Sequence, residues 1–220
     1  SSYQINSTMK TIQYTLIDGI ATITFDEPNS PVNTMCLQWQ DDMAEVAAQV
    51  AQDKDAIKGI LLASAKSTFF AGADLKATMR ATADDAQAGF AVIERMKQQF
   101  RTLETLGIPV VACLNGAALG GGWEVALIAH RRIALDNPNI QFGLPEVTLG
   151  LIPGATGITK MTRLLGLMGA QPYLLEGKLF NPQDAVKLGL VHATVATAQE
   201  LLPAALAWIA ANPKAQQPWD

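Results

Sequence analysis

The chain of 220 residues is long enough for one large domain. Hydrophobic residues make up 49% of it and charged residues only 16%, which excludes a disordered chain and predicts a well-filled core. The formal net charge of −4 excludes a general electrostatic attraction to nucleic acids or anionic membranes.

The cysteines and the start of the chain indicate a reducing compartment. Cys36 and Cys113 show no metal-ligand spacing and are expected to be reduced core thiols, which favours a cytoplasmic location. No apolar run is long enough to span a bilayer, and the polar first eight residues do not resemble a secretory signal. We expect residues 1–8 to be a flexible lead-in to a domain that covers residues 9–211.

The first predicted elements are a β-hairpin, a helix and a buried strand. Residues 13–15 and 20–25 are strand-like and flank the turn at Asp18 and Gly19. Residues 37–52 carry apolar side chains at helical spacing and predict an amphipathic helix. The continuous apolar run 57–63 is typical of a strand buried in an α/β sheet.

Strands and helices continue to alternate up to about residue 135. A small-residue loop covers residues 64–74, and a long helix over 83–106 is expected to end at Gly107. The later predicted elements are strands over 109–114 and 132–135, a small-residue turn over 115–122, and helices over 123–130, 159–167, 171–175, 182–188 and 200–211. This order predicts an α/β fold with repeated β-β-α turns and a helical C-terminal part.

Two loops of small residues follow the two buried strands. Glycines at positions 120–122 precede a predicted helix, whose first N–H groups lack acceptors and attract negative charge. The loop over residues 69–75 has the same character. One N–H from each loop could bind the same oxygen, as in an oxyanion hole for a thioester or ester carbonyl. Alternatively, both loops are tight turns that pack a helix on the sheet.

Two glutamates stand in apolar surroundings near these loops. Glu124 follows the glycine run, and Glu146 follows Pro145. Each alone fits a helix-start carboxylate that is favoured by the helix dipole. Together with the two loops they indicate acid–base chemistry, in which one carboxylate holds a water and the other, kept protonated by its apolar site, delivers a proton.

Other candidate residues give weaker signals. His130 and His192 lack the nucleophile motif of a hydrolase, and no phosphate-binding glycine motif is present. Three aspartates could bind a metal, cap a helix or simply be exposed to solvent. They are Asp74, Asp84 and Asp85. Lys66 and Lys76 flank the first small-residue loop, either as surface lysines or to neutralise the phosphates of a ligand.

Three ordered motifs resemble the crotonase (enoyl-CoA hydratase/isomerase) superfamily. They are FFAGADL at 69–75, NGAALGGGWE at 115–124, and FGLPE at 142–146 with GLIPG at 150–154. The resemblance extends from the first strand to about Val195. It implies a crotonase (ClpP-like) spiral of ββα turns with a helical C-terminal part. It also implies an acyl-CoA thioester as substrate, with coenzyme A as part of that substrate and no tightly bound cofactor or metal.

The resemblance assigns roles to individual residues. It implies that the N–H groups of Ala73 and Gly121 bind the thioester oxygen and that Glu124 and Glu146 are the catalytic pair of a hydratase. Water would then add to the C2=C3 bond of a 2-trans-enoyl-CoA, with Glu124 as base and Glu146 as the proton donor to C2. Further contacts to acyl-CoA are expected from Ala71, Asp74, Leu75, Lys76, Gly122 and Pro145.

The segment 28–34 and the proline-containing end 212–220 resemble the hydratase part of multifunctional fatty-acid β-oxidation α-subunits. This implies that residues 212–220 begin a linker to a 3-hydroxyacyl-CoA dehydrogenase domain and that a thiolase subunit is a partner of the full-length protein. Such relatives also isomerise Δ3-enoyl-CoA to Δ2-enoyl-CoA. The alternatives are an isomerase only, or a non-catalytic assembly or binding module. An RNA-binding module is poorly supported by 16 basic against 20 acidic residues.

Overall fold

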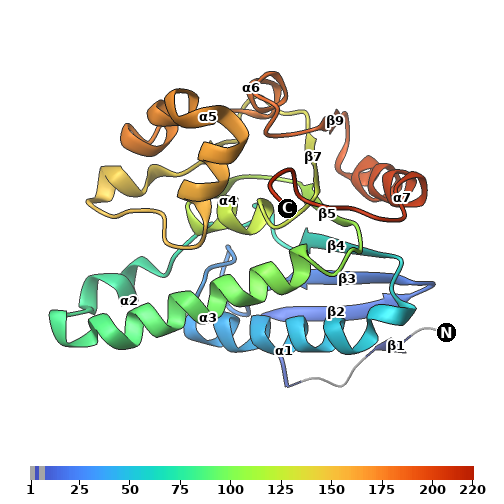
Figure 1. Cartoon of the computed structure of the whole chain (residues 1–220), viewed down its shortest axis with the longest axis horizontal. Coiled ribbons are helices and arrows are strands. Elements are labelled where there is room, and N and C mark those ends of the chain that lie inside the picture. Colours follow the sequence, from blue (N-terminus) through green and yellow to red (C-terminus); the bar gives the residue numbers. More distant parts are fainter. Residues whose placement is uncertain (1–2, 5–7) are drawn as a thin grey trace.

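A twisted, largely parallel sheet forms the centre of the molecule in the computed structural model, which describes residues 3–4 and 8–220 (Figure 1). Within those residues the sheet has seven strands in the order β1-β2-β3-β4-β5-β7-β9. Their bounds are β1 (Tyr3–Gln4), β2 (Ile12–Ile17), β3 (Ile20–Phe25), β4 (Gly59–Ser64), β5 (Val110–Leu114), β7 (Arg131–Leu135) and β9 (Ala193–Val195). The first three strands are antiparallel, and the strands from β3 to β9 are parallel.

The hairpin and the buried strands form as the sequence predicts. Asp18 and Gly19 both adopt positive φ, 52° and 86°, which suits a tight turn between β2 and β3. Along β4 the side chains alternate between two cores. Leu61 belongs to the smaller core under α7 (Leu201–Ala211), whereas Ile60 and Leu62 belong to the main core on the other face.

Helices cover both faces of this sheet. The helices α1 (Leu37–Asp53) and α3 (Ala86–Glu104) run along the side of the main core, and α7 lies at the other side (Figure 1). Gly59 in β4 permits the close approach of α7, because a Cβ there would lie 2.5 Å from Cγ2 of Ile209. This α/β architecture agrees with the predicted fold class.

A second, two-stranded sheet holds the small-residue loops together. It pairs β6 (Ala118–Leu119) with β8 (Phe142–Gly143), and an isolated bridge joins Phe70 to Ala118. The helix α4 (Gly121–Ala126) begins directly after β6, and the short helix α2 (Leu75–Arg80) follows the first loop. The sequence did not predict α2, β6 or β8.

The C-terminal part is helical. It comprises α5 (Gly157–Leu175), α6 (Pro182–Lys187) and α7. The sequence predicts α5 as two helices, and the chain does break inside it at Gly166, where φ is 74°. Short 3₁₀ helices occur at Lys54–Ala56, Ala83–Asp85, Pro145–Leu149 and Ala198–Glu200.

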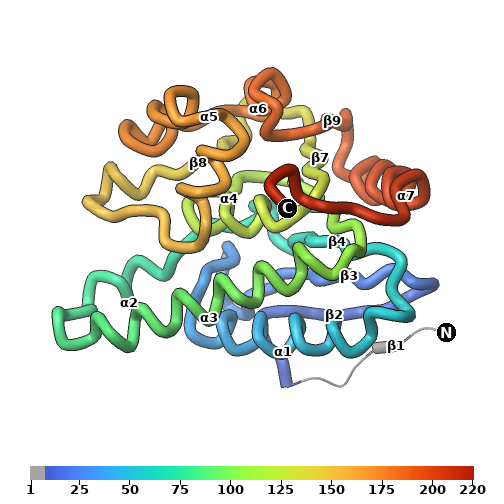
Figure 2. The backbone as a smooth tube through the Cα atoms, in the orientation of Figure 1, coloured from blue at the N-terminus to red at the C-terminus, as the bar shows by residue number. Residues whose placement is uncertain are grey.

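Residues near both ends of the chain make contacts with the domain. Residues 1–2 and 5–7 of the expected lead-in lie outside the described residues, but Tyr3 and Gln4 pair with β2, whose edge offers free backbone groups. The tail 212–220, expected as a linker, folds back across the molecule (Figure 2). Gln217 is only 4% exposed and donates from Nε2 to the carbonyl of Ile128 over 2.9 Å, which fixes the tail.

One expected boundary is wrong by several residues. The helix predicted over 123–130 begins at Gly121, directly after Gly120 at φ 55°, and ends at Ala126. Among the described residues, no helix has the length and hydropathy needed to cross a bilayer.

Candidate active site

Glu124 lies in the first turn of α4 and is 2% exposed. Its Oε1 accepts hydrogen bonds from the backbone N–H groups of Ala155 and Gly157, each over 2.8 Å. Gly157 leaves room for the carboxylate, since a Cβ there would lie 2.8 Å from Oε1. No protein group in the described ranges donates to Oε2. One carboxylate oxygen is therefore fixed while the other is free to exchange a proton.

Glu146 lies in the 3₁₀ helix that starts at Pro145. Both of its carboxylate oxygens are buried and have no hydrogen-bond partner among the residues that the structure describes. The side chain packs against Gly120, where a Cβ would lie 2.6 Å from Oε1 of Glu146. Such an uncompensated buried carboxylate is costly and favours the protonated form.

Burial changes the acidity of both groups. It raises the pKa of Glu124 to about 7, with the negative charge of Glu146 adding to the rise and the N–H groups of Gly157 and Ala155 opposing it. Burial also raises the pKa of Glu146. Two carboxyl groups that titrate above the usual range can exchange protons with a substrate near neutral pH.

Two backbone N–H groups face the same region. Gly121 is the first residue of α4, so its N–H has no acceptor within the helix. Gly72, at φ 108°, sets the direction of the Ala73 N–H and lies close to α4, because a Cβ on it would be 3.4 Å from the Gly121 nitrogen. Within the described part of the chain, neither the Ala73 nor the Gly121 N–H has an acceptor. Together they can stabilise negative charge on a carbonyl oxygen.

A cavity of about 330 Å³ connects these groups. Ala73, Gly121, Glu124 and Glu146 all line it, so the structure brings together the four residues for which the sequence suggests chemistry. The remaining wall is mostly apolar and is formed by Met35, Cys36, Leu37, Gln40, Asp74, Ala77, Thr78, Val92, Ile93, Met96, Leu151, Ile152, Gly154 and Ala155. A mostly apolar cavity with a few convergent polar groups is typical of a small-molecule site.

The six further residues expected to contact acyl-CoA divide into two groups. Only Asp74 lines the cavity, and it also caps α2 by accepting from the Ala77 N–H over 3.2 Å. The others, which are Ala71, Leu75, Lys76, Gly122 and Pro145, lie around the cavity without lining it.

Packing explains two of these five positions. Gly122 lies against the Phe70 carbonyl, where a Cβ would approach the oxygen to 2.1 Å. The Ala71 N–H donates to the Asn33 carbonyl over 2.8 Å. Lys76 and Leu75 are exposed on α2.

Sequence reasoning missed several residues of the site. Ala155 and Gly157 donate the hydrogen bonds to Glu124, and Met35 lies against Gly121, where a Cβ would be 2.6 Å from the Met35 sulfur. The motif at 150–154 was the available signal, because Leu151, Ile152 and Gly154 line the cavity. No sequence pattern near Met35 indicates its role.

The weaker candidates have structural roles. His130 Nδ1 accepts from the Val110 N–H, and His192 Nδ1 accepts from the Arg132 N–H, each over 3.0 Å. Burial lowers the pKa of His192 to about 4, which keeps the ring neutral. The ammonium group of Lys66 donates to the Glu27 carbonyl and pairs with Asp26 at 3.1 Å, so these contacts fix its position.

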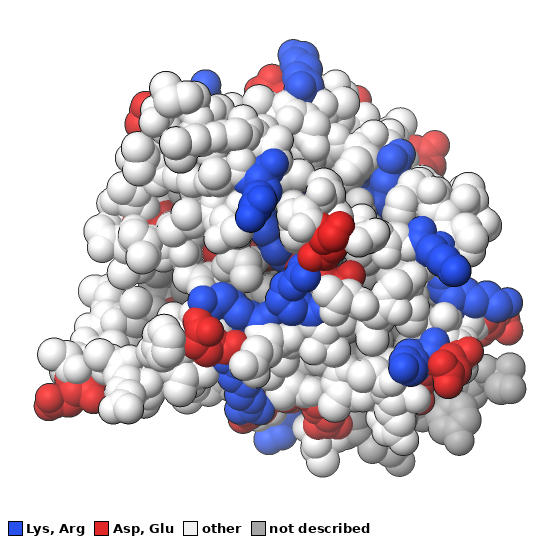
Figure 3. Space-filling model, viewed as in Figure 1, with Lys and Arg blue, Asp and Glu red and all other residues white. Residues whose placement is uncertain are grey.

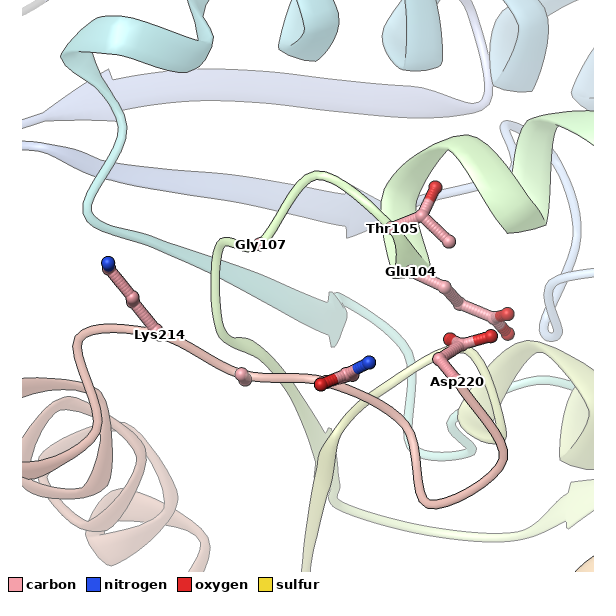
Figure 4. Close-up of a pocket in the computed structure, with 7 residues that line it drawn as sticks. Glu104, Thr105, Gly107, Lys214 and Asp220 are labelled. Carbon is pink, nitrogen blue, oxygen red and sulfur yellow. The ribbon is translucent and has the colours of Figure 1, made fainter.

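A larger groove of about 640 Å³ lies elsewhere, between the end of α3 and the C-terminal tail, and none of the predicted site residues lines it (Figure 4). Glu104 from α3 and Asp220 from the tail lie close together there, while Lys214 points away (Figure 4). Arg101 joins the two carboxylates, with NH1 2.5 Å from Glu104 Oε2 and NH2 2.6 Å from Asp220 Oδ1. An ion pair between α3 and the tail therefore lies at this groove.

The paired glutamates and the residues of the two N–H groups thus line one cavity in a fold built on a largely parallel sheet. The family model described as enoyl-CoA hydratase/isomerase matches residues 16–217, and the chain belongs to this family.

Relatives and solved structures support this membership. The chain is 40% identical over 179 residues to the fatty acid oxidation complex subunit alpha of Shewanella frigidimarina, covering 81% of this chain and 25% of that protein. An enoyl-CoA hydratase structure from Bacillus anthracis matches with a TM-score of 0.80 and 27% identity, covering 91% of this chain and 76% of that one. An enoyl-CoA hydratase structure from Geobacillus kaustophilus has the same fold, with a TM-score of 0.86 at 23% identity over 97% of this chain and 77% of that one. The chain spans about a quarter of the length of the curated relatives it matches.

Proposed function

We propose that this chain is an enoyl-CoA hydratase that adds water to a 2-trans-enoyl-CoA and gives a 3-hydroxyacyl-CoA. The observation that carries the proposal is the convergence of Glu124, Glu146 and the N–H groups of Ala73 and Gly121 on one cavity. A hydratase needs a base, an acid and a site for enolate charge, and this cavity supplies each of them.

In this mechanism the Ala73 and Gly121 N–H groups bind the thioester oxygen and draw electron density from C3. Glu124, held through Oε1, takes a proton from water on its free oxygen while the water oxygen bonds to C3. The C2=C3 π electrons form a C1=C2 double bond, and the carbonyl π electrons move onto the thioester oxygen to give an enolate. Glu146 then donates its proton to C2 and the thioester carbonyl reforms. Proton transfer from Glu124 to Glu146 through water resets the site.

The environment of the two glutamates supports this division of roles. Glu124, with a pKa of about 7, is ionised in a large fraction of molecules at neutral pH and can act as a base. Burial raises the pKa of Glu146, against a smaller opposing effect of its own backbone N–H, and favours its protonated form, as an acid requires. The same unpartnered carboxylate could move a proton between C4 and C2, so we extend the proposal to Δ3-Δ2-enoyl-CoA isomerisation.

The proposal includes a biological setting. The relatives named as α-subunits of a fatty acid oxidation complex favour a role in fatty-acid β-oxidation, with coenzyme A as the carrier of the substrate. In a full-length protein of this kind, we expect a dehydrogenase domain after residue 220 and a thiolase subunit as partner. Cys36 and Cys113 are free thiols, in keeping with the cytoplasmic location that we propose.

A hydration assay tests the proposal. Loss of the conjugated enoyl-thioester absorbance is followed with crotonyl-CoA and with a longer 2-enoyl-CoA. Glu124→Gln and Glu146→Gln should each lower kcat about 10²–10⁴-fold, the usual contribution of an acid–base group. Glu176→Gln, at an exposed glutamate outside the cavity, is the matched control and should keep wild-type activity.

The alternatives give different results in the same preparation. A folded chain that converts a 3-enoyl-CoA to the 2-enoyl-CoA without hydrating it would be an isomerase only. A folded chain that binds acyl-CoA without converting either substrate would be a non-catalytic module.

A further inference from the structure

A cavity with a cationic wall adjoins the candidate active site. Its volume is about 440 Å³, and four of its lining residues are cationic, which are Lys97, Arg101, Lys160 and Arg163. No aspartate or glutamate of the described residues lines it. Figure 3 shows lysine and arginine side chains gathered on this face, between α3 and the start of α5. Such a wall attracts an anionic group to any of its cations that no carboxylate already neutralises.

The two cavities meet at Gly154, which lines both. Along α3, Ile93 lines the active-site cavity and Lys97, one turn later, lines the cationic cavity. A Cβ at Gly154 would be in ordinary van der Waals contact with Cδ1 of Ile93, at 3.6 Å, so Gly154 and Ile93 lie close together where the two cavities adjoin. The two cavities therefore adjoin at Gly154, and we call the cationic cavity the extension of the active-site cavity.

The order of groups along these cavities places the extension at the far end of the acyl chain. The thioester oxygen lies at Ala73 and Gly121 in the proposed mechanism, and the reacting carbons lie at the two glutamates. Glu124 is hydrogen-bonded to Ala155, the neighbour of Gly154. An acyl chain that leads away from the thioester past Glu124 toward Ala155 thus approaches Gly154 and the cationic cavity.

Most of the positive charge in the extension is already paired. Lys160 pairs with the buried Glu104, Arg101 pairs with Asp220 and Glu104, and Lys97 pairs with Glu94 at 2.5 Å. Among the described residues, Arg163 is the one cation of this wall without a carboxylate within 4 Å.

Polar and apolar groups complete the extension. Thr156 Oγ1 is buried there and has no hydrogen-bond partner in the described ranges. Pro153, Ile158 and Trp219 supply apolar surface beside it. The wall thus offers apolar contacts for the last methylenes of a chain, a free hydroxyl and a free guanidinium.

We propose that this extension binds a terminal carboxylate, so that the CoA thioesters of dicarboxylic 2-enoic acids are substrates of this site. The inference rests on the proposed hydratase function and specifies its substrate class. Arg163 is a specificity-determining residue in this view, and its guanidinium and the Thr156 hydroxyl bind the carboxylate.

Paired substrates of equal length test the proposal. The value of kcat/KM is measured for a ten-carbon 2-enoyl-CoA and for its ω-carboxylated counterpart, and their ratio is compared between variants. Arg163→Ala should lower the ratio of ω-carboxylated to plain substrate about fivefold or more, which is the effect of losing one charge-assisted hydrogen bond. Arg163→Glu should lower it further. Arg95→Ala, an exposed arginine of α3 outside both cavities, is the matched control and should keep the wild-type ratio.

Two results would overturn the inference. An unchanged ratio in Arg163→Ala is one, including the case in which both substrates weaken equally, because Arg163 would then bind the phosphates of coenzyme A. The other is a wild-type enzyme that discriminates strongly against the ω-carboxylated substrate.

Equilibrium binding separates this inference from the proposed function. Titration calorimetry with decanoyl-CoA and decanedioyl-CoA gives the same ratio without catalysis. A chain that fails to hydrate crotonyl-CoA would refute the hydratase, while the affinity ratio and its loss in Arg163→Ala would still decide the carboxylate site.

Discussion

The Gly157 N–H donates to Glu124 Oε1 over 2.8 Å, although the two residues are 33 positions apart in the chain. This bond joins the start of α5 to the first turn of α4. Ala155 donates to the same oxygen, so the loop that precedes α5 determines the orientation of the carboxylate. The position of Glu124 therefore depends on a glycine that contributes no side chain.

Gly157→Ala is expected to lower hydration of crotonyl-CoA more than tenfold. The added Cβ would lie 2.8 Å from Oε1 and 2.9 Å from Cγ of Glu124, and 3.0 Å from Cδ1 of Leu144, so the carboxylate must move. A displacement of about 1 Å in an active site can cost on the order of 10²-fold in rate.

Gly169→Ala is the matched control on the same helix. Its Cβ would meet only Leu165, at 3.3 Å, and alanine is the better helix former. We expect activity close to wild type. Comparable activity losses in the two variants would show that the Gly157 effect does not arise at Glu124.

The pH dependence of stability should report on Glu124. Its pKa is about 7 in the folded chain and near 4.5 when unfolded, so the folded state binds more protons between these values. Stability is then fully present below about pH 4.5 and is lost as the pH rises through 7. Glu124→Gln removes this pH-dependent loss of stability, because glutamine does not ionise. Its side-chain oxygen can still accept hydrogen bonds from the same two N–H groups.

Urea unfolding of wild type and Glu124→Gln at pH 5 and pH 8 measures the effect. From pH 5 to pH 8, the free energy of unfolding of wild type should fall by about 2 kcal/mol relative to that of Glu124→Gln. A stability difference that is the same at both pH values would mean that Glu124 is not buried as a titrating carboxyl group.

The elements formed by local sequence were predictable. The hairpin at Asp18 and Gly19 needs only turn chemistry, and α1 needs only the spacing of its apolar residues. The two buried strands β4 and β5 are likewise visible as apolar runs. By contrast, α2 is a short exposed helix capped by Asp74, and its stability does not depend on an apolar face that a pattern could reveal.

The candidate site was only partly predictable for the same reason. Glu124 and Glu146 are conspicuous as carboxylates in apolar sequence, and glycine at 120–122 indicates a close backbone approach. The hydrogen-bond donors to Glu124 are backbone groups, which any residue type except proline provides. Their identity follows from how α5 packs on α4, and so does the junction at Gly154.

Removal of Glu104 should destabilise the fold strongly. This buried glutamate of α3 pairs with Lys160 of α5 and with Arg101, and Lys160 is itself buried. Glu104→Ala leaves the ammonium of Lys160 without its partner, which typically costs about 3–5 kcal/mol. Chemical denaturation of the variant measures the loss.

A double variant and an exposed pair provide the comparison. Replacing both buried charges, Glu104→Gln with Lys160→Met, should recover part of the stability, because the ammonium of Lys160 is then no longer left without its partner. Glu94→Ala breaks the exposed pair with Lys97 and should cost less than about 1 kcal/mol. Equal losses for Glu94→Ala and Glu104→Ala would contradict the burial of the Glu104 pair.

Gly72→Ala should remove most of the activity by moving the Ala73 N–H. Gly72 adopts φ 108°, which disfavours a side chain, and its Cβ would lie 2.7 Å from the Leu119 carbonyl oxygen. The loop must shift away from Gly121, and loss of one oxyanion donor costs about 10²–10³-fold in kcat.

Gly89→Ala serves as the control, because a Cβ at Gly89 meets no atom within 4 Å. The rate should fall with little change in the acyl-CoA affinity measured by calorimetry, since the charge on the thioester oxygen develops only in the transition state. An equal loss of affinity and rate would instead assign the Ala73 loop to substrate binding alone.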